Sequence, residues 1–298
     1  MKYFKPLSLG LYLYTLLVIL WGAWVRISKS GDGCGDSWPL CDGKVIPSTK
    51  SLATWIEFSH RLTTGLFGIF VVVLCVMVLK NKSSNVYLKR VAKLSVLFTI
   101  SEALLGAALV KFGLVTDNDS FLRLFVMGLH QVNSLLLSGF IGLCIIFYKS
   151  DIKVHWSMIK TLLCSCFLLL AATGAIASLS TTLHPSTSLL SGLQADLFEN
   201  SHWIIKWRSI HPILATVLGG TLLYVFILQG AKTGFTKELK DLIRLFAVGL
   251  IFGALTLTFL SPMWMKLTHL LLAHLLWLFL LRYLVQVISK LSANGRRV

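Results

Sequence analysis

The sequence predicts an all-α integral membrane protein, with eight transmembrane helices arranged as two pseudo-symmetric four-helix bundles. Three observations predict this fold: the composition, the spacing of the apolar runs and an internal repeat. Of the 298 residues, 56% are hydrophobic and only 13% are charged, which is far from the usage of soluble domains. The mean hydropathy of +0.78 agrees with this.

Eight apolar runs are each long enough to cross a bilayer, which takes roughly 20 residues of helix. They are predicted at residues 8–27, 53–79, 92–115, 122–148, 158–179, 204–229, 243–260 and 263–288. The first run is too long for the apolar part of a signal peptide and lacks a small-residue cleavage site. We therefore expect it to be the first span.

The formal net charge of +16 is distributed unevenly along the chain. With the N-terminus placed inside, the inner segments hold about twice as many lysines and arginines as the outer segments, which hold most of the acids. The positive-inside rule therefore predicts a multi-pass protein of the cell membrane with both termini in the cytoplasm. The basic balance reflects this topology and argues against nucleic-acid binding.

A Gly- and Pro-rich outer loop follows the first span and contains Cys34 and Cys41. Because the outer face is oxidising in bacteria, this pair predicts a disulfide bond. A structural staple and a redox-active dithiol both remain open, and a metal site is disfavoured because no histidine lies between the two. The other cysteines fall inside spans and are expected to be small buried hydrophobic residues.

The second span begins with a polar pair, Glu57 and His60, three residues apart. That spacing places both side chains on one helix face, about one turn apart, near the outer end of the span. Charged groups are costly in a bilayer and are usually functional there. Imidazole is a ligand for iron, and a nearby carboxyl group can transfer protons. The pair is the candidate catalytic centre, whereas Glu102 in the third span is open to a structural or a functional role.

The first four spans resemble the last four when they are aligned in order. The four pairs of matched anchors are Gly22-Ala23 with Gly174-Ala175, His60 with His211, Gly106-Ala107 with Gly253-Ala254, and His130 with His269. Collinear matches of this kind predict a duplicated four-helix unit, with the two repeats parallel about an axis along the membrane normal.

The repeat selects four histidines at similar depth below the outer ends of their helices. A lone membrane histidine is more often a hydrogen-bonded bundle residue, but two per repeat predict one clamped iron per bundle. His274 follows His269 by five residues, about 140° around the helix, so only one of them can face a given metal. We choose His269, with His274 as the fallback.

The two halves differ where Glu57 is matched by Arg208. A carboxyl group suits acid–base chemistry, whereas a guanidinium suits a haem propionate by bidentate pairing. Arg26 and Arg61 lie near the same outer edge and are further candidate propionate contacts. This asymmetry predicts a reactive N-terminal half and a C-terminal half that holds a permanent haem.

The chain resembles the haem A synthase family over nearly its whole length. The resemblance is carried by Gly22-Ala23-x-Val25-Arg26, by the loop from Gly33-Cys34-Gly35 through Trp38-Pro39-Leu40-Cys41 to Gly43, by Glu57-x-x-His60-Arg61, and by His130, His211 and His269. The loop matches the bacterial type with an outer cysteine pair. A second outer pair, present in some members, is absent from residues 180–203.

The resemblance implies oxidation of the C8 methyl group of haem O to a formyl group, which gives haem A for terminal oxidases. It implies residues 1–150 as the substrate half, with His60 and His130 near haem O and Glu57 as the catalytic acid. It implies residues 151–298 as the haem b half, with His211 and His269 as iron ligands. A protohaem farnesyltransferase that makes haem O is an implied partner.

Two alternatives belong to other classes of protein. A di-haem b membrane cytochrome that oxidises quinol would use the same four histidines and would not need Glu57. A transporter built on two repeats would purify without haem absorption. A visible spectrum with pigment analysis separates the three hypotheses.

Overall fold

The computed structural model describes residues 4–48, 51–150, 152, 154, 156–198 and 200–287. Within these residues the protein is helical, and eight helical segments are long and apolar enough to cross a membrane. Contacts group the chain into two compact units, Met1–Tyr148 and Lys149–Val298. The predicted all-α fold of eight spans is confirmed, while the assignment of the halves to substrate and haem b stays a prediction.

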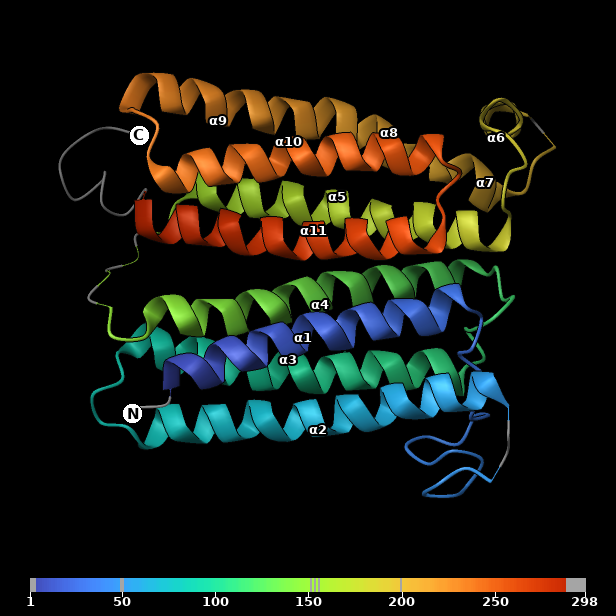
Figure 1. The fold of residues 1–298 in the computed structure, drawn as a ribbon, viewed down its shortest axis with the longest axis horizontal. Helices are drawn as coiled ribbons and strands as arrows, with labels where there is room; N and C mark the ends of the chain where they lie inside the picture. Colours follow the sequence, from blue (N-terminus) through green and yellow to red (C-terminus); the bar gives the residue numbers. More distant parts are fainter. Residues whose placement is uncertain are drawn as a thin grey trace. The chain divides into compact units, whose positions relative to one another are not determined.

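The first unit contains four long helices that run side by side (Figure 1). They are α1 (Phe4–Ile27), α2 (Leu52–Lys80), α3 (Val86–Lys111) and α4 (Phe121–Phe147). Helix α1 packs against α2 and α4, and α3 packs against the same two helices, so the four form a closed bundle. Fully buried apolar side chains such as Leu74 and Leu135 fill its interior.

The second unit repeats this arrangement with interruptions (Figure 1). Its elements are α5 (Met158–Leu183), α6 (Leu189–Leu197), α7 (Trp203–Arg208), α8 (Ile210–Leu214), the π-helix η1 (Ala215–Gly219), α9 (Gly220–Thr233), α10 (Lys237–Thr258), α11 (Met263–Arg282) and the π-helix η2 (Tyr283–Val287). Helix α5 contacts α7, α8 and α11, and α10 contacts α9 and α11. The order of packing therefore matches that of α1 to α4.

The helix ends extend beyond several predicted spans. Helix α3 begins at Val86 instead of residue 92, because the side chain of Asn85 caps it by accepting from the backbone of Leu88 at 2.8 Å. Helix α10 begins at Lys237 instead of residue 243, capped in the same way by Thr236. Hydropathy locates the apolar centre of a span, whereas caps decide where the helix starts. The predicted end of the last span, residue 288, lies outside the described residues.

The sixth span is not the single helix that the apolar run predicts. It is divided at Ser209 between α7 and α8, and it continues through one π-helical turn before α9. Pro212 has no backbone N–H, so the carbonyl of Arg208 loses its usual helical partner. Irregular turns of this kind are common at functional sites, and His211 lies in this interruption. The structure also adds α6 within an outer segment that the apolar runs predict as a loop.

Candidate functional site

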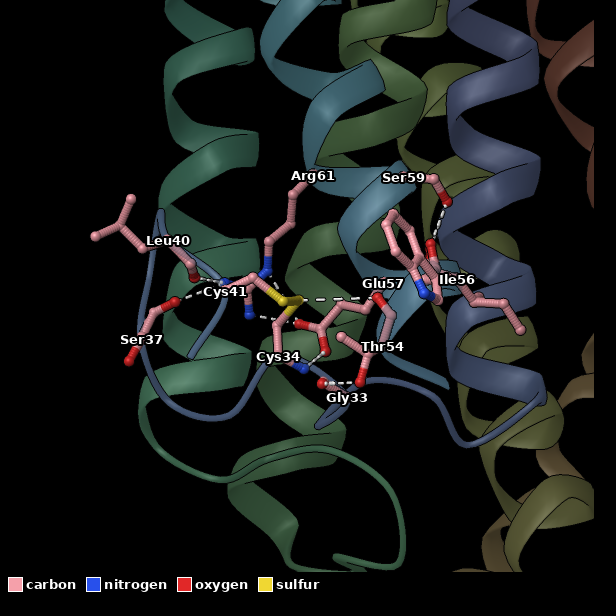
Figure 2. The surroundings of a disulfide bond; sticks show 11 residues. Gly33, Cys34, Ser37, Leu40, Cys41, Thr54, Ile56, Glu57, Ser59 and Arg61 are labelled. Carbon is pink, nitrogen blue, oxygen red and sulfur yellow. Dashed lines mark hydrogen bonds and ion pairs between the residues drawn. A yellow bond between two sulfur atoms is a disulfide. The ribbon is translucent and has the colours of Figure 1, made fainter. Parts of the chain in front are cut away.

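The outer loop of the first unit is closed by the predicted disulfide between Cys34 and Cys41, whose Cα atoms are 4.4 Å apart. Figure 2 shows this loop lying against the start of α2. The backbone N–H of Cys34 donates to Oε2 of Glu57 at 2.9 Å. The hydroxyl of Thr54 donates to the carbonyl of Gly33 at 2.6 Å. The disulfide prediction is confirmed, and the loop is joined to the helix that carries Glu57 and His60.

Arg61 links the same loop to α2 (Figure 2). Its Nε donates to Oε1 of Glu57 at 3.1 Å, and Nη2 forms an ion pair with the same oxygen at 2.5 Å. Its Nη1 donates to the carbonyls of Ser37 and Leu40. Glu57 is only 3% exposed. Both oxygens of this carboxylate and most donors of the guanidinium are therefore engaged within the protein, and a propionate contact of Arg61 stays a prediction.

Gly33 allows the loop to approach α2 this closely. A Cβ atom at this position would lie 2.5 Å from the backbone carbon of Ala53 and 2.6 Å from the backbone nitrogen of Thr54. Backbone atoms cannot move aside as a flexible side chain can. The glycine is therefore required by packing, and the Gly-Cys pair of the loop motif has a physical explanation.

His60 lies eight residues after the start of α2, about 12 Å along the helix. Its imidazole ring packs against Gly22 of α1, where a Cβ atom would lie only 2.9 Å from Cε1. Its Nδ1 is buried and has no hydrogen-bond partner. His130 lies on α4, which packs against α1, the helix that the His60 ring contacts. The first unit thus holds in one bundle the two histidines that the repeat selected.

His130 lies beside an acid and an amide. Its Nδ1 is 3.3 Å from Oε2 of Glu102 in α3, and that oxygen also accepts from Nδ2 of Asn133 at 2.6 Å. The ring faces Gly106, where a Cβ atom would lie 3.9 Å from Cε1. The histidine side chain is 33% exposed and the glutamate 21%. Asn133 was not singled out from the sequence, because an amide within a span has no charge to mark it.

Arg26 and Arg123 place two guanidinium groups near this centre. Arg26 lies at the end of α1, and its buried Nη1 has no hydrogen-bond partner among the residues that the structure describes. Arg123 is 2% exposed and donates through Nη1 to the carbonyls of Thr116 and Asn118. An unpaired buried donor is costly unless an acceptor completes it. Arg26 therefore suits a bound carboxylate, as predicted for a propionate, and Arg123 is an additional cation that the sequence did not single out.

The second unit brings His211 and His269 together, with ring centroids 6.3 Å apart and ring planes at 71°. A Cβ atom at Gly174 would lie 3.1 Å from Cε1 of His211, and one at Gly253 would lie 3.0 Å from Cε1 of His269. Nδ1 of His211 is 3.2 Å from the hydroxyl of Thr173. Nδ1 of His269 is buried and has no hydrogen-bond partner. His211 therefore packs against Gly174 as His60 packs against Gly22, and His269 packs against Gly253 as His130 faces Gly106.

The spacing of these two rings suits two ligands of one iron. A metal–nitrogen bond of about 2 Å, plus about 1.1 Å from nitrogen to ring centre, places two opposed imidazole centroids about 6 Å apart. The observed 6.3 Å agrees with this value. Both side chains are half-buried and so are open to a bound group. His274, the fallback ligand, is 1% exposed and lies inside the bundle, which favours His269.

Arg208 holds the outer segment of the second unit. Its Nε donates to Asp196 at 2.5 Å, and its Nη2 donates to the carbonyl of Gly192 at 2.7 Å. A weaker bond at 3.4 Å reaches the carbonyl of His184. Arg208 therefore fixes α6 much as Glu57, its partner in the repeat, fixes the disulfide loop. Its contact with a propionate stays a prediction.

Two related bundles of four spans, each with paired imidazoles below one end, define a class of membrane proteins suited to bind haem iron. A family model described as "Cytochrome oxidase assembly protein" (COX15-CtaA) matches residues 5–281. The chain belongs to this family, and the resemblance found in the sequence is confirmed.

Several curated proteins are similar to the chain over all or part of its length. The chain is similar to a protein named protoheme IX farnesyltransferase from Thermus thermophilus, with 31% identity over 300 residues that cover 97% of this chain and 48% of the relative. The chain thus spans about half the length of that relative. It is also similar to proteins named heme A synthase from Bacillus cereus and Bacillus anthracis, each with 45% identity over 112 residues, 38% of this chain and 36% of the relative.

Proposed function

We propose that this chain is a haem A synthase, which oxidises the C8 methyl group of haem O to a formyl group. Counted with water as the oxygen donor, the change from methyl through alcohol to aldehyde is R–CH3 + H2O → R–CHO + 4 H+ + 4 e−, and an external acceptor takes the four electrons. The observation that carries the proposal is the 6.3 Å spacing of His211 and His269, in a chain of the cytochrome oxidase assembly family. Similarity to proteins named heme A synthase supports the reaction.

In this proposal, His211 and His269 hold haem b in the second unit. Bound there, haem b would supply one-electron transfer. Gly174 and Gly253 keep the two helices beside these rings close enough to fix their orientation. The bond between Thr173 and Nδ1 of His211 favours Nε2 as the atom of His211 that meets iron.

His60 and His130 orient substrate haem O in the first unit. The unpaired Nη1 of Arg26 supports its role as the partner of a propionate, because a carboxylate would satisfy this buried donor. Haem O would come from a protohaem farnesyltransferase acting before this enzyme. The similarity to a relative named for that activity supports this link.

Glu57 is proposed as the acid–base residue beside His60. Its burial and its bonds to Cys34 and Arg61 also fit an anchoring role. Glu57→Gln keeps one acceptor oxygen but cannot take up a proton, and it loses one of the two anchoring contacts, so its thermal unfolding is measured beside its activity to separate the two roles. The catalytic role predicts that Glu57→Gln binds haem O and makes little haem A. Near-normal haem A production by this variant would leave Glu57 as an anchor of the loop only.

The proposed topology places both termini in the cytoplasm of a cell whose plasma membrane contains this protein. The distribution of lysine and arginine supports it. The disulfide loop would then face the oxidising side, where the bond between Cys34 and Cys41 persists. Labelling of a single cysteine introduced in the loop after α2 or after α4 tests this orientation. The reagent is applied to the outer face of intact cells and, separately, to opened cells.

The decisive experiment uses the purified full chain supplied with haem O and an electron acceptor, followed by pigment extraction. Haem A in the extract is the expected result. Recovery of two unchanged b-type haems would favour the alternative of a di-haem quinol cytochrome. A preparation without haem absorption in wild type would contradict both and favour a transporter.

A further inference from the structure

Glu102 is an acidic residue within the third span, and it has no role in the proposed reaction. Its Oε2 accepts from Nδ2 of Asn133 at 2.6 Å and lies 3.3 Å from Nδ1 of His130. Asn133 is fixed in turn, because Nδ2 also donates to the carbonyl of Phe98 at 2.9 Å and Oδ1 accepts from Ser101 at 2.6 Å. The carboxylate is therefore held in place beside one imidazole.

The other half of the molecule lacks this arrangement. Glu102 lies four residues before Gly106, and the residue four before Gly253 is Gly249. Asn133 lies three residues after His130, and the residue three after His269 is Leu272. Correspondingly, Nδ1 of His269 is buried and has no hydrogen-bond partner in the described part of the chain. The first unit thus has a carboxylate and an amide, from Glu102 and Asn133, at two positions where the second unit has a glycine and a leucine.

Neutral imidazole carries one N–H, so a histidine that binds iron through Nε2 must carry its proton on Nδ1. A carboxylate that accepts this proton fixes the orientation of the ring and makes it a stronger donor to the metal. The 3.3 Å contact is longer than an ideal hydrogen bond, and Nδ1 has no better-aligned partner. Such contacts commonly shorten when the ligand binds.

We propose that Glu102, held by Asn133, is a positioning residue that accepts the Nδ1 proton of His130 and directs Nε2 toward the iron of substrate haem O. This inference rests on the proposed function. It gives the two bundles different tasks: the substrate half holds its iron with a carboxylate-supported imidazole, and the haem b half does not. A stronger axial donor stabilises ferric over ferrous iron, so it lowers the reduction potential of the bound haem.

The test uses the full chain with its haem b site filled and haem O added as the probe. Glu102→Gln keeps the size of the side chain and removes its charge. We expect haem O to bind about 10- to 100-fold more weakly, as is typical when a partner of a metal-bound histidine is lost. We also expect the reduction potential of the bound haem O to rise and its low-spin electron paramagnetic resonance signal to change. The spectrum of haem b should stay as in wild type, which also reports correct folding.

Asn133→Leu provides a second variant, because it leaves Glu102 in the chain and removes the group that holds it. It should shift the potential of haem O in the same direction by a smaller amount. The reciprocal variant, Gly249→Glu with Leu272→Asn, should lower the potential of haem b. A Cβ atom at Gly249 meets only Leu276, at an ordinary 4.0 Å, so this position accepts a side chain.

The outcomes separate the inference from the proposed function. Unchanged affinity, potential and resonance signal in Glu102→Gln would overturn the positioning role while leaving haem O binding intact. If wild type binds no haem O in its first unit, the proposed substrate site fails, and the inference fails with it. A weaker affinity with an unchanged potential and signal would reduce Glu102 to a packing residue and also overturn the inference.

Discussion

Replacing Gly22 with alanine should displace the imidazole of His60, a proposed ligand of haem O iron, without unfolding the bundle. The added Cβ would lie 2.9 Å from Cε1 and 3.0 Å from Nε2 of the ring. Carbon atoms in ordinary contact are about 3.5–4.0 Å apart. The ring must therefore move by about 0.5–1 Å, whereas metal–ligand distances tolerate about 0.2 Å.

The expected cost falls on function more than on stability. A ring pushed away from its preferred rotamer costs about 0.5–1.5 kcal/mol, and alanine in place of helical glycine returns about 1 kcal/mol. The free energy of unfolding should therefore change little. A misplacement of about 1 Å at a reacting centre can cost about 100-fold in rate, so haem A formation by Gly22→Ala should fall by about 10- to 100-fold.

Gly106→Ala is the matched control, because its Cβ would lie 3.9 Å from Cε1 of His130, an ordinary contact. It gains the same helix propensity and displaces no ring, so it should make haem A at nearly the wild-type rate. The assay compares haem A formed per minute by equal amounts of each purified variant. Wild-type activity in Gly22→Ala, or equal losses in the two variants, would refute the reasoning.

Three further predictions concern the outer segments. Asp196→Asn should leave the buried guanidinium of Arg208 without its counter-charge, and the loss of one partner of a buried ion pair lowers the free energy of unfolding by about 3–5 kcal/mol. Limited proteolysis should then cut near α6 faster than in wild type. An unchanged cutting rate would contradict the prediction. Gly33→Ala should lower the free energy of unfolding by about 1–3 kcal/mol through overpacking against the start of α2, which thermal unfolding in detergent would measure. The exposed Asp117 accepts a hydrogen bond from Lys29 at 2.5 Å, which lowers the pKa of this carboxyl below its usual range. The stabilisation from this ion pair should therefore be complete above the unfolded-state pKa of Asp117 and be lost as pH falls through the lower folded-state pKa. Lys29→Met should raise the pKa of Asp117 measured by carboxyl NMR, and the difference from wild type should shrink in high salt.

The outer loops of the two units show how a duplicated fold acquires different functions. Glu57 and Arg208 occupy matching positions, and each fixes the segment above its own bundle. The first unit adds a covalent bond between Cys34 and Cys41, whereas the second uses a buried ion pair with Asp196. The charge at this position is opposite in the two halves, yet the mechanical role is shared. Propionate binding is therefore better supported for Arg26, whose Nη1 remains unpaired.

The eight spans, the disulfide pair and the repeat that selects four histidines can all be predicted from the amino-acid sequence. These features are readable because a bilayer demands long apolar runs, and because polar side chains within such runs are rare enough to stand out. The repeat alone selects His269 over His274, and the half-buried ring of the former beside Gly253 agrees with that choice.

The contacts of those polar groups depend on how the helices pack. Hydropathy cannot reveal that the sixth span breaks at Ser209, since local backbone geometry follows from Pro212 and its neighbours. Nor can spacing along one helix show that Asn133 holds Glu102 beside His130, because the contact joins α3 to α4. The ability of a segment to cross a membrane follows from its own composition. A site, in contrast, is formed by side chains that are far apart in the chain and meet only when the helices pack.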